Sequence, residues 1–402
     1  MMRVSYATSL HGKDEVNAVV SVLKGNTALG EKTIAFEKSI AKLFGKKFGV
    51  MVNSGSSANL LALELLNLPK GSEIITPVLT FATTVAPILQ KGLKPIFVDV
   101  EPGTYLMNTR LIEKRITKNT RAIMAPSLIG NVPDLKYLRG IAKRHNLWLI
   151  EDSCDTLGAT YAGNPTGMYS DISTTSFYGS HIINGAGGGG MILVNNPEWA
   201  KRLIILRGWG RMSSLFGETG ESEDIKKRFR ARLGNVPYDA KFVFSEIGYN
   251  FLPLEISAAF ALAQLRKLPQ FIKTRQKNFK RLEEFFRRYE KFFLLPRETS
   301  LIRTAWLAFP LTIKEGAPFS RKDICMFLER HNIQTRPIFT GNILCQPAFR
   351  NIRRGISSGD YPVSNHVMSH AFLIGCHQGL TSAHIQYMQD IFKKFFKALS
   401  IL

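Results

Sequence analysis

Short apolar runs alternate with segments that carry apolar residues at helical spacing through the first half of the chain. The runs predict buried strands, and the helical spacing, bounded by glycine or by capping residues, predicts helices. The predicted strands are 48–52, 73–77, 95–100, 121–126 and 147–151, and the predicted helices are 12–25, 33–44, 60–66, 82–90 and 134–145. Strands and helices that alternate at these lengths form βαβ units, so we expect an α/β fold with a parallel sheet covered by helices on both faces.

The pattern becomes less regular after Leu193. Residues 207–235 are rich in glycine, serine and charged side chains, which predicts a long mobile insertion. An Ala/Leu-rich segment, 256–268, and a basic amphipathic segment, 267–291, then predict two successive helices. Beyond Pro296 we expect two or three further strand and helix units.

A chain of 402 residues is long enough for one large and one smaller domain. We expect a large domain, 1–265, with an irregular insertion at about 207–240, and a smaller C-terminal α/β domain, 266–402.

The charge balance is strongly basic, with 53 Lys and Arg residues against 31 Asp and Glu residues and a formal net charge of +22. The cations are spread over the whole chain and are densest in 267–291, where they occupy the polar face of the predicted helix. We interpret them as a solvated surface. Such a surface favours small anionic substrates and does not predict nucleic-acid binding.

Neither a membrane segment nor an export signal is expected, because no apolar run reaches spanning length and the first residues lack an apolar core. The four cysteines, Cys154, Cys325, Cys345 and Cys376, lie far apart and form no CxxC or paired pattern. That spacing predicts neither disulfide bonds nor a metal site. A cytoplasmic location fits these features.

Residues that could bind or react with a ligand follow two of the predicted strands and a further β-rich run that begins at Thr174. A Gly/Ser turn, Gly55–Ser57, joins a strand to a helix, and free N–H groups at such a helix N-terminus bind anions. Asp152 follows the strand 147–151, and Ser176 and His181 begin a stretch that ends in Gly185 and four glycines at 187–190. Because ligand sites of parallel sheets lie at the carboxyl ends of strands, we expect these groups to meet.

The chemistry of this set fits a phosphorylated pyridine ring. Asp152 would pair with a protonated ring nitrogen, Gly55–Ser57 and Ser176 would hold the phosphate, and Phe81 would stack on the ring. Neither a GxGxxG motif nor a P-loop is present. The alternatives at this point are a capped helix at the Gly/Ser turn, a strand-end cap at Asp152, a core role for Phe81 and a structural histidine in a tight turn.

The chain resembles the DegT/DnrJ/EryC1/StrS sugar aminotransferases, which have the fold of type I pyridoxal-phosphate enzymes. The matching stretches are SGSSAN at 54–59, TFAT at 80–83, EDSCD at 151–155, SFY at 176–178 and GYN at 248–250. The resemblance implies a mostly parallel, seven-stranded type of sheet flanked by helices, with the smaller domain at the C-terminus. It implies a homodimer, in which Asn250 reaches the cofactor phosphate of the partner subunit.

The resemblance also implies roles for individual residues. The family places the position of Asp152 at the pyridine nitrogen, those of Ser56, Ser57 and Ser176 at the phosphate, and that of Phe81 on the ring. Asp155 is expected at the ring oxygen, with a solvent-facing role as the alternative.

One position departs from the aminotransferase pattern. Where those enzymes carry the lysine that holds the cofactor as a Schiff base, this chain has His181. Imidazole cannot form that bond, so the cofactor would be bound non-covalently, as pyridoxamine phosphate. A subgroup with this replacement is the 3-dehydratases of nucleotide-linked 4-keto-6-deoxy sugars, and the chain is similar to the GDP-4-keto-6-deoxymannose 3-dehydratases. The shared stretches are GNTALG at 25–30, MVNSGSSANLL at 51–61 and RPIFTGN at 336–342.

The resemblance therefore implies loss of the C3 hydroxyl, with His181 moving protons and L-glutamate restoring the amine form of the cofactor. Such a reaction belongs to deoxysugar biosynthesis, for example of lipopolysaccharide O-antigen. Arg336 and Asn342 are candidate contacts to the sugar nucleotide, with salt-bridge or turn roles as alternatives. An iron–sulfur cluster is not expected, because no cysteine lies between Cys154 and Cys325.

Two other functions remain open. One is a sugar-nucleotide aminotransferase in which another lysine substitutes, although no lysine occurs from Phe177 to Asn196. The other is a non-catalytic relative that binds the sugar nucleotide or the cofactor.

Overall fold

The computed structural model describes residues 2–216, 224–353 and 358–399. The α-helices are α1 (Lys13–Leu23), α2 (Glu31–Leu43), α3 (Gly55–Leu66), α4 (Ala82–Gln90), α5 (Leu135–Arg144), α6 (Pro197–Arg207), α7 (Ile225–Arg228), α8 (Glu255–Phe286), α9 (Arg321–Arg330), α10 (Pro362–His370) and α11 (Ser382–Ala398). The strands are β1 (Phe48–Val52), β2 (Glu73–Pro77), β3 (Lys94–Val98), β4 (Thr120–Pro126), β5 (Trp148–Asp152), β6 (Thr160–Tyr161), β7 (Asn164–Pro165), β8 (Ile172–Ser176), β9 (Gly190–Val194), β10 (Ala231–Leu233), β11 (Val236–Tyr238), β12 (Phe293–Leu294), β13 (Ile302–Arg303), β14 (Phe309–Ile313) and β15 (Ala371–Ile374).

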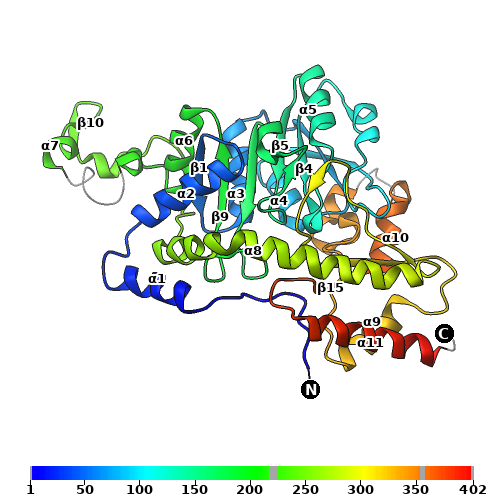
Figure 1. Ribbon diagram of the computed structural model, residues 1–402. Helices are drawn as coiled ribbons and strands as arrows, with labels where there is room; N and C mark the ends of the chain where they lie inside the picture. The colour runs from blue at the N-terminus through cyan, green and yellow to red at the C-terminus, as the bar shows by residue number, and fades with distance from the viewer. Residues whose placement is uncertain (1, 217–223, 354–357, 400–402) are drawn as a thin grey trace.

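The central sheet has seven strands in the order β1-β9-β8-β5-β4-β2-β3 (Figure 1). Neighbouring strands from β8 to β3 run parallel, and β9 runs antiparallel to both of its neighbours, β1 and β8. The predicted α/β fold with a mostly parallel seven-stranded sheet is therefore confirmed. A smaller antiparallel sheet, β12-β14-β15, lies in the C-terminal part of the chain.

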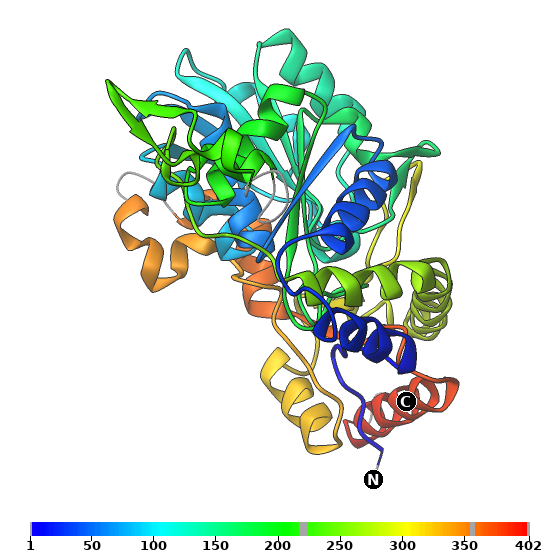
Figure 2. The ribbon, with the colours of Figure 1, turned by 90° about the vertical axis from the view of Figure 1, so that its left-hand side faces the viewer.

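Helices cover the sheet on both faces (Figure 2). Successive residues of its strands face opposite sides. In β1, Val50 and Val52 pack in a core with Leu61 of α3, whereas Met51 packs with Phe36 of α2. Burial on both faces explains why the strands read as continuous apolar runs.

Helix α3 begins five residues earlier than the sequence indicated. Its N-cap is Ser54, whose Oγ accepts a hydrogen bond from the backbone N–H of Ser57 at 3.1 Å. Residues 55–59, which the sequence placed before the helix, therefore form its beginning. This shift matters for the site, because it places the helix N-terminus directly at the end of β1.

The two helices predicted for 256–291 are one helix, α8, of 32 residues, and this part of the prediction was wrong. Pro269 lies inside it, where the missing N–H removes one backbone hydrogen bond without ending the helix. The expected domain division at 265–266 lies within α8. Its first half packs against the sheet-side core through Ala261 and Phe271, and its second half enters the C-terminal core through Phe286.

The segment between α6 and α8 projects from one edge of the molecule, where α7 and β10 are labelled (Figure 1). It is more regular than expected, because β10 and β11 pair as an antiparallel hairpin. Residues 217–223 of the predicted insertion lie outside the described residues. None of the helices in the described part of the chain combines the length and the apolar character needed to cross a bilayer.

Candidate active site

A cavity of about 560 Å³ lies at the carboxyl ends of the parallel strands. Its walls are formed by residues that directly follow β1, β4, β5 and β8, together with the start of α4, the N-terminal segment and parts of the C-terminal half. The polar residues that line it are Tyr6, Ser54, Ser56, Asn59, Thr83, Thr84, Ser127, Asp152, Cys154, Asp155, Ser176, Tyr178, Ser180, His181 and Arg336. The three strand ends that the sequence singled out do meet here.

Asp152, at the end of β5, is held by hydrogen bonds to both of its carboxylate oxygens. Its Oδ2 accepts from Asn59 Nδ2 and from Thr84 Oγ1, each at 2.9 Å, and its Oδ1 accepts from the Cys154 backbone N–H at 3.3 Å. The side chain is buried and its orientation is fixed by three elements, α3, α4 and β5. A carboxylate in this setting can hold a positive charge presented from the cavity.

At the end of the cavity that contains Asp152, another wall is formed by the start of α3 and the end of β8. The first N–H groups of a helix have no partner within it, so the N-terminus of α3 offers free donors and the positive end of its dipole. A methyl group at Gly55 would lie 2.7 Å from Ser176 Cβ and 2.9 Å from Cys154 Sγ, so only glycine fits this close approach. Ser56 Oγ also lines the cavity and donates to Thr83 Oγ1 at 2.9 Å.

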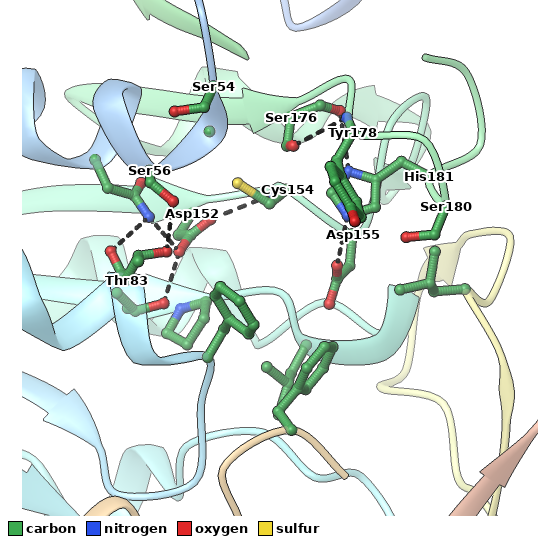
Figure 3. A pocket seen from close by; sticks show the side chains of 18 of the residues that line it. Ser54, Ser56, Thr83, Asp152, Cys154, Asp155, Ser176, Tyr178, Ser180 and His181 are labelled. Carbon is green, nitrogen blue, oxygen red and sulfur yellow. Dashed lines mark hydrogen bonds and ion pairs between the residues drawn. The ribbon is translucent and has the colours of Figure 1, made fainter. Parts of the chain in front are cut away.

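His181 lies at the other end of the cavity, in the loop between β8 and β9 (Figure 3). Its Nδ1 lies 3.2 Å from the carbonyl oxygen of Ser176, an acceptor that fixes the proton of a neutral ring on Nδ1. The Nε2 lone pair is then free. Burial lowers the pKa of His181 to about 4, so the ring is neutral at neutral pH.

Asp155 faces His181 across 3.7 Å, measured from Oδ1 to Nε2 (Figure 3). Its Oδ2 accepts the backbone N–H of Ile129 at 2.9 Å. Burial raises the pKa of Asp155 to about 7, and the nearby charge of Asp152 adds to the increase. A base that stays neutral and a carboxyl group that keeps its proton near neutral pH thus lie side by side.

Aromatic rings and Arg336 form the mouth of the cavity. Phe81 is about half exposed and contacts Phe339 edge to face, with ring centroids 5.8 Å apart. Tyr178 is 62% exposed, and its ring centroid lies 6.1 Å from that of His181. Arg336 is exposed, and its guanidinium lies 5.9 Å from the ring of Tyr6.

Three predicted site residues are not among those that line the cavity. Ser57 is turned away, and its Oγ donates to Asn53 Oδ1 at 2.6 Å. Asn342 is fully buried, caps a short helical turn and donates to Asn365 Oδ1 at 2.8 Å, a turn role of the kind kept open from sequence. Asn250 is exposed at the base of the projecting segment.

The structure adds residues that were not assigned from sequence. Asn59 and Thr84, the partners of Asp152, lie within or beside quoted motifs, so their position carried a signal that was not used. Tyr6 lines the cavity from a distant part of the chain, and no local pattern marks it.

The residues present fit a phosphorylated pyridine ring. A helix N-terminus with serine hydroxyls lies at one wall, a buried and fully hydrogen-bonded carboxylate lies beside it, and Phe81 offers a ring face at the mouth. Among the described residues that line the cavity, none is a lysine.

Comparisons with known proteins agree with this geometry. The model of the DegT/DnrJ/EryC1/StrS aminotransferase family matches residues 10–393. The chain is 39% identical to a dTDP-4-dehydro-2,6-dideoxy-D-glucose 3-dehydratase of Saccharopolyspora spinosa, over 95% of this chain and 84% of that protein. It is 38% identical to the lipopolysaccharide biosynthesis protein RfbH of Salmonella typhimurium, over 96% and 90% of the two chains.

A solved structure is also similar over nearly the whole length. The GDP-4-keto-6-deoxy-D-mannose-3-dehydratase of Escherichia coli, with bound hydrated pyridoxal phosphate, superposes with a TM-score of 0.87 at 29% identity. The match covers 97% of this chain and 99% of that one.

Proposed function

The chain belongs to the DegT/DnrJ/EryC1/StrS aminotransferase family, and we propose that it removes the C3 hydroxyl group of a nucleotide-linked 4-keto-6-deoxyhexose. The family and its solved members make it a pyridoxal-phosphate-dependent, sugar-modifying enzyme. The proposal adds that pyridoxamine phosphate is bound without a covalent link and that L-glutamate restores it. The observation that carries it is the imidazole of His181 in a cavity where no described lining residue is a lysine.

When bound, the cofactor supplies an electron sink, and the protein supplies position, charge and proton transfer. Asp152 would pair with the positive ring nitrogen, and its three hydrogen bonds hold the carboxylate in place to do so. Ser56, Ser176 and the N-terminus of α3 would hold the phosphate.

His181 has the properties of a base at neutral pH. Its Nδ1 hydrogen is directed at a carbonyl group, its Nε2 is free, and its lowered pKa of about 4 keeps the ring unprotonated until it accepts a proton from the substrate. Loss of hydroxide needs a proton in return. Nε2 can deliver the proton it has taken, and the neighbouring carboxyl of Asp155 holds a second one near neutral pH.

Overall, the hydroxyl oxygen at C3 leaves as water, the C4 ketone is kept and glutamate is oxidised to 2-oxoglutarate with release of ammonia. The relatives named 3-dehydratases and the lipopolysaccharide biosynthesis protein support this chemistry and its place in deoxysugar biosynthesis. The expected absence of an iron–sulfur cluster stays a prediction.

A homodimer is part of the proposal, with Asn250 reaching the partner's cofactor site. The projecting segment supports it, because it exposes apolar side chains that a monomer would leave in water. The most exposed of them are Ile225, Phe229, Val236, Ile247 and Leu254. Asn250 is itself exposed and does not line the cavity of its own chain.

The decisive experiment is product analysis by mass spectrometry, with glutamate and a panel of 4-keto-6-deoxy sugar nucleotides. We expect a product that lacks one oxygen and retains a ketone, formed together with 2-oxoglutarate. A product that gains nitrogen instead would identify an aminotransferase, and no turnover or spectral response to pyridoxamine phosphate would identify a non-catalytic relative.

Replacement of His181 by lysine provides a second test. We expect His181→Lys to form a borohydride-reducible link to the cofactor and to lose deoxygenation. A reducible link to lysine in the unmodified protein would contradict the proposal.

A further inference from the structure

A buried arginine of α8 lies behind the catalytic end of the cavity and joins its two sides. Arg275 is completely buried. Its Nε donates to Gln378 Oε1 at 2.6 Å, and its Nη1 donates to the carbonyl oxygens of Trp306 and Leu307 at 3.1 and 2.9 Å. The guanidinium therefore binds a side chain on one side and the backbone of a wall residue of the cavity on the other.

The first connection leads to His181. Gln378 uses its acceptor for Arg275 and donates from Nε2 to the carbonyl oxygen of Ile182 at 3.1 Å. Ile182 is the residue next to His181. Since a planar amide satisfied at both ends has little freedom to rotate, Gln378 transmits the position of Arg275 to the loop that carries the imidazole.

The second connection leads to Asp155. The backbone N–H of Leu307 donates to the carbonyl oxygen of Ile129 at 2.8 Å, and the N–H of Ile129 donates to Asp155 Oδ2 at 2.9 Å. Ile129 has φ of +58°, a left-handed conformation that a β-branched residue adopts only under strain. Such strain persists where the surroundings fix the backbone, and here it aims an N–H group at the carboxylate.

The two connections thus lead from Arg275 to two groups that face each other, His181 and Asp155, with 3.7 Å between Nε2 and Oδ1. Within the described residues no carboxylate forms an ion pair with Arg275, and its Nη2 has no hydrogen-bond partner. Although burial lowers its pKa to about 10, Arg275 is a cation at neutral pH. A cation without a counter-ion at this place adds to the field that keeps His181 neutral.

We propose that Arg275 is a positioning residue for the reaction, which through Gln378 and Leu307 fixes the distance and orientation of His181 relative to Asp155. The inference deepens the proposed function, since it rests on His181 as the proton-transferring group. The charged and titratable groups that face the imidazole are Asp155 and Asp152 from the end of β5, Arg275 from α8 and Tyr178 from its own loop.

The test compares Arg275→Met, Arg275→Lys and Gln378→Leu with a matched control, Gln264→Leu. Gln264 is a buried amide on the same helix, about three turns before Arg275, and its Nε2 donates to the carbonyl oxygen of Leu10 at 2.7 Å and to Glu15 Oε1 at 3.0 Å. The control therefore removes a buried amide of α8 that takes no part in either connection. Unfolding midpoints of all four variants report any loss of stability.

The first readout is the titration of His181 by NMR in ligand-free protein with ¹³C-labelled histidine, assigned with His181→Asn. We expect the pKa of His181 to rise by about one unit or more in Arg275→Met, because a nearby positive charge has been removed. Arg275→Lys keeps the charge and Gln378→Leu keeps the guanidinium, so both should leave it within about half a unit of the original. This readout does not depend on which reaction the enzyme catalyses, so it separates failure of the inference from failure of the proposed function.

The second readout is steady-state kinetics on the sugar nucleotide. Gln378→Leu and Arg275→Lys should lower kcat about tenfold or more with KM nearly unchanged, because a misplacement near 1 Å suffices for such losses. Gln264→Leu should keep both kcat and the pH profile. If Arg275→Met titrates like the unmodified protein, or if Gln378→Leu behaves like Gln264→Leu, the positioning role is wrong.

Discussion

The two ends of the cavity each carry one aspartate from the carboxyl end of β5, Asp152 as its last residue and Asp155 from the turn that follows, and their surroundings differ. Asp152 has three hydrogen bonds of 2.9 to 3.3 Å to two side chains and one backbone N–H. Asp155 has one, from Ile129, and otherwise faces an imidazole at 3.7 Å. Burial raises the pKa of Asp155, whereas the donors around Asp152 are those that stabilise a carboxylate.

The difference separates two functions. A carboxylate with three donors already in place is suited to hold a fixed charge, and a carboxyl group with few donors beside a neutral imidazole is suited to exchange protons. A separation of three residues is enough to produce both environments, because Asp152 contacts donors from α3 and α4 whereas Asp155 contacts Ile129 and His181.

The largest effect on activity is expected at the end of the cavity that contains His181 and Asp155. His181→Asn keeps the polarity of the site but removes the base, so the rate of C3 deoxygenation should fall by about 10²- to 10⁴-fold. Single-turnover rates measure the loss, and His145→Asn, which makes the same replacement at an exposed histidine outside the cavity, is the control. A loss of less than about threefold in His181→Asn would remove the imidazole from the mechanism.

At the end of the cavity that contains Asp152, the substitution Asp152→Asn should weaken binding of the cofactor. The amide keeps the shape but loses the charge, and hydrogen bonds to a charged group are worth about 1.5–3 kcal/mol, so affinity for pyridoxamine phosphate should fall about 10- to 100-fold. Fluorescence titration of the ligand-free protein measures this. Unchanged affinity would place the ring nitrogen elsewhere.

The pH dependence of stability tests the raised pKa of Asp155. Since the folded protein keeps the Asp155 proton up to about pH 7 while an unfolded chain loses it near pH 4, stability falls as the pH rises between these values. Asp155→Asn removes that fall, so its free energy of unfolding relative to the unmodified protein should increase from pH 5 to pH 8 by an amount on the order of 2 kcal/mol.

Urea unfolding of ligand-free protein at pH 5 and pH 8 measures the difference. Asp390→Asn, on the exposed face of α11, is the control for the replacement of an aspartate by asparagine. An equal result for the two variants would contradict the raised pKa.

The smallest effect is expected at the mouth of the cavity. Phe81→Leu removes an aromatic face but keeps an apolar side chain, and a ring contact contributes about 0.5–1.5 kcal/mol. Cofactor affinity should therefore fall about 2- to 10-fold, with little change in stability because Phe81 is half exposed. An unchanged affinity would contradict stacking of Phe81 on the cofactor, and its contact with Phe339 would then be its only assigned role.

The sequence predicted the sheet and the meeting of its strand ends well, because apolar runs and turn residues are local signals that the fold keeps. Asp152, Ser176 and His181 could be located for the same reason, since each lies at the end of a strand or in the loop that follows it. The contribution of Tyr6 and the path from Arg275 to Asp155 could not be predicted, because they depend on contacts between residues far apart in the sequence, such as Leu307 with Ile129. The single helix α8 was missed since Pro269 and the change in composition resemble a helix boundary.

The continuity of α8 has a consequence for how the chain is assembled. At about 1.5 Å per residue the helix is a rod of roughly 48 Å, and its apolar face is shared between the sheet-side core and the C-terminal core. A fragment that ends at residue 265 would cut this rod and expose half of each interface. The two halves should therefore melt in one cooperative transition, and neither should be obtainable as a stable piece by itself.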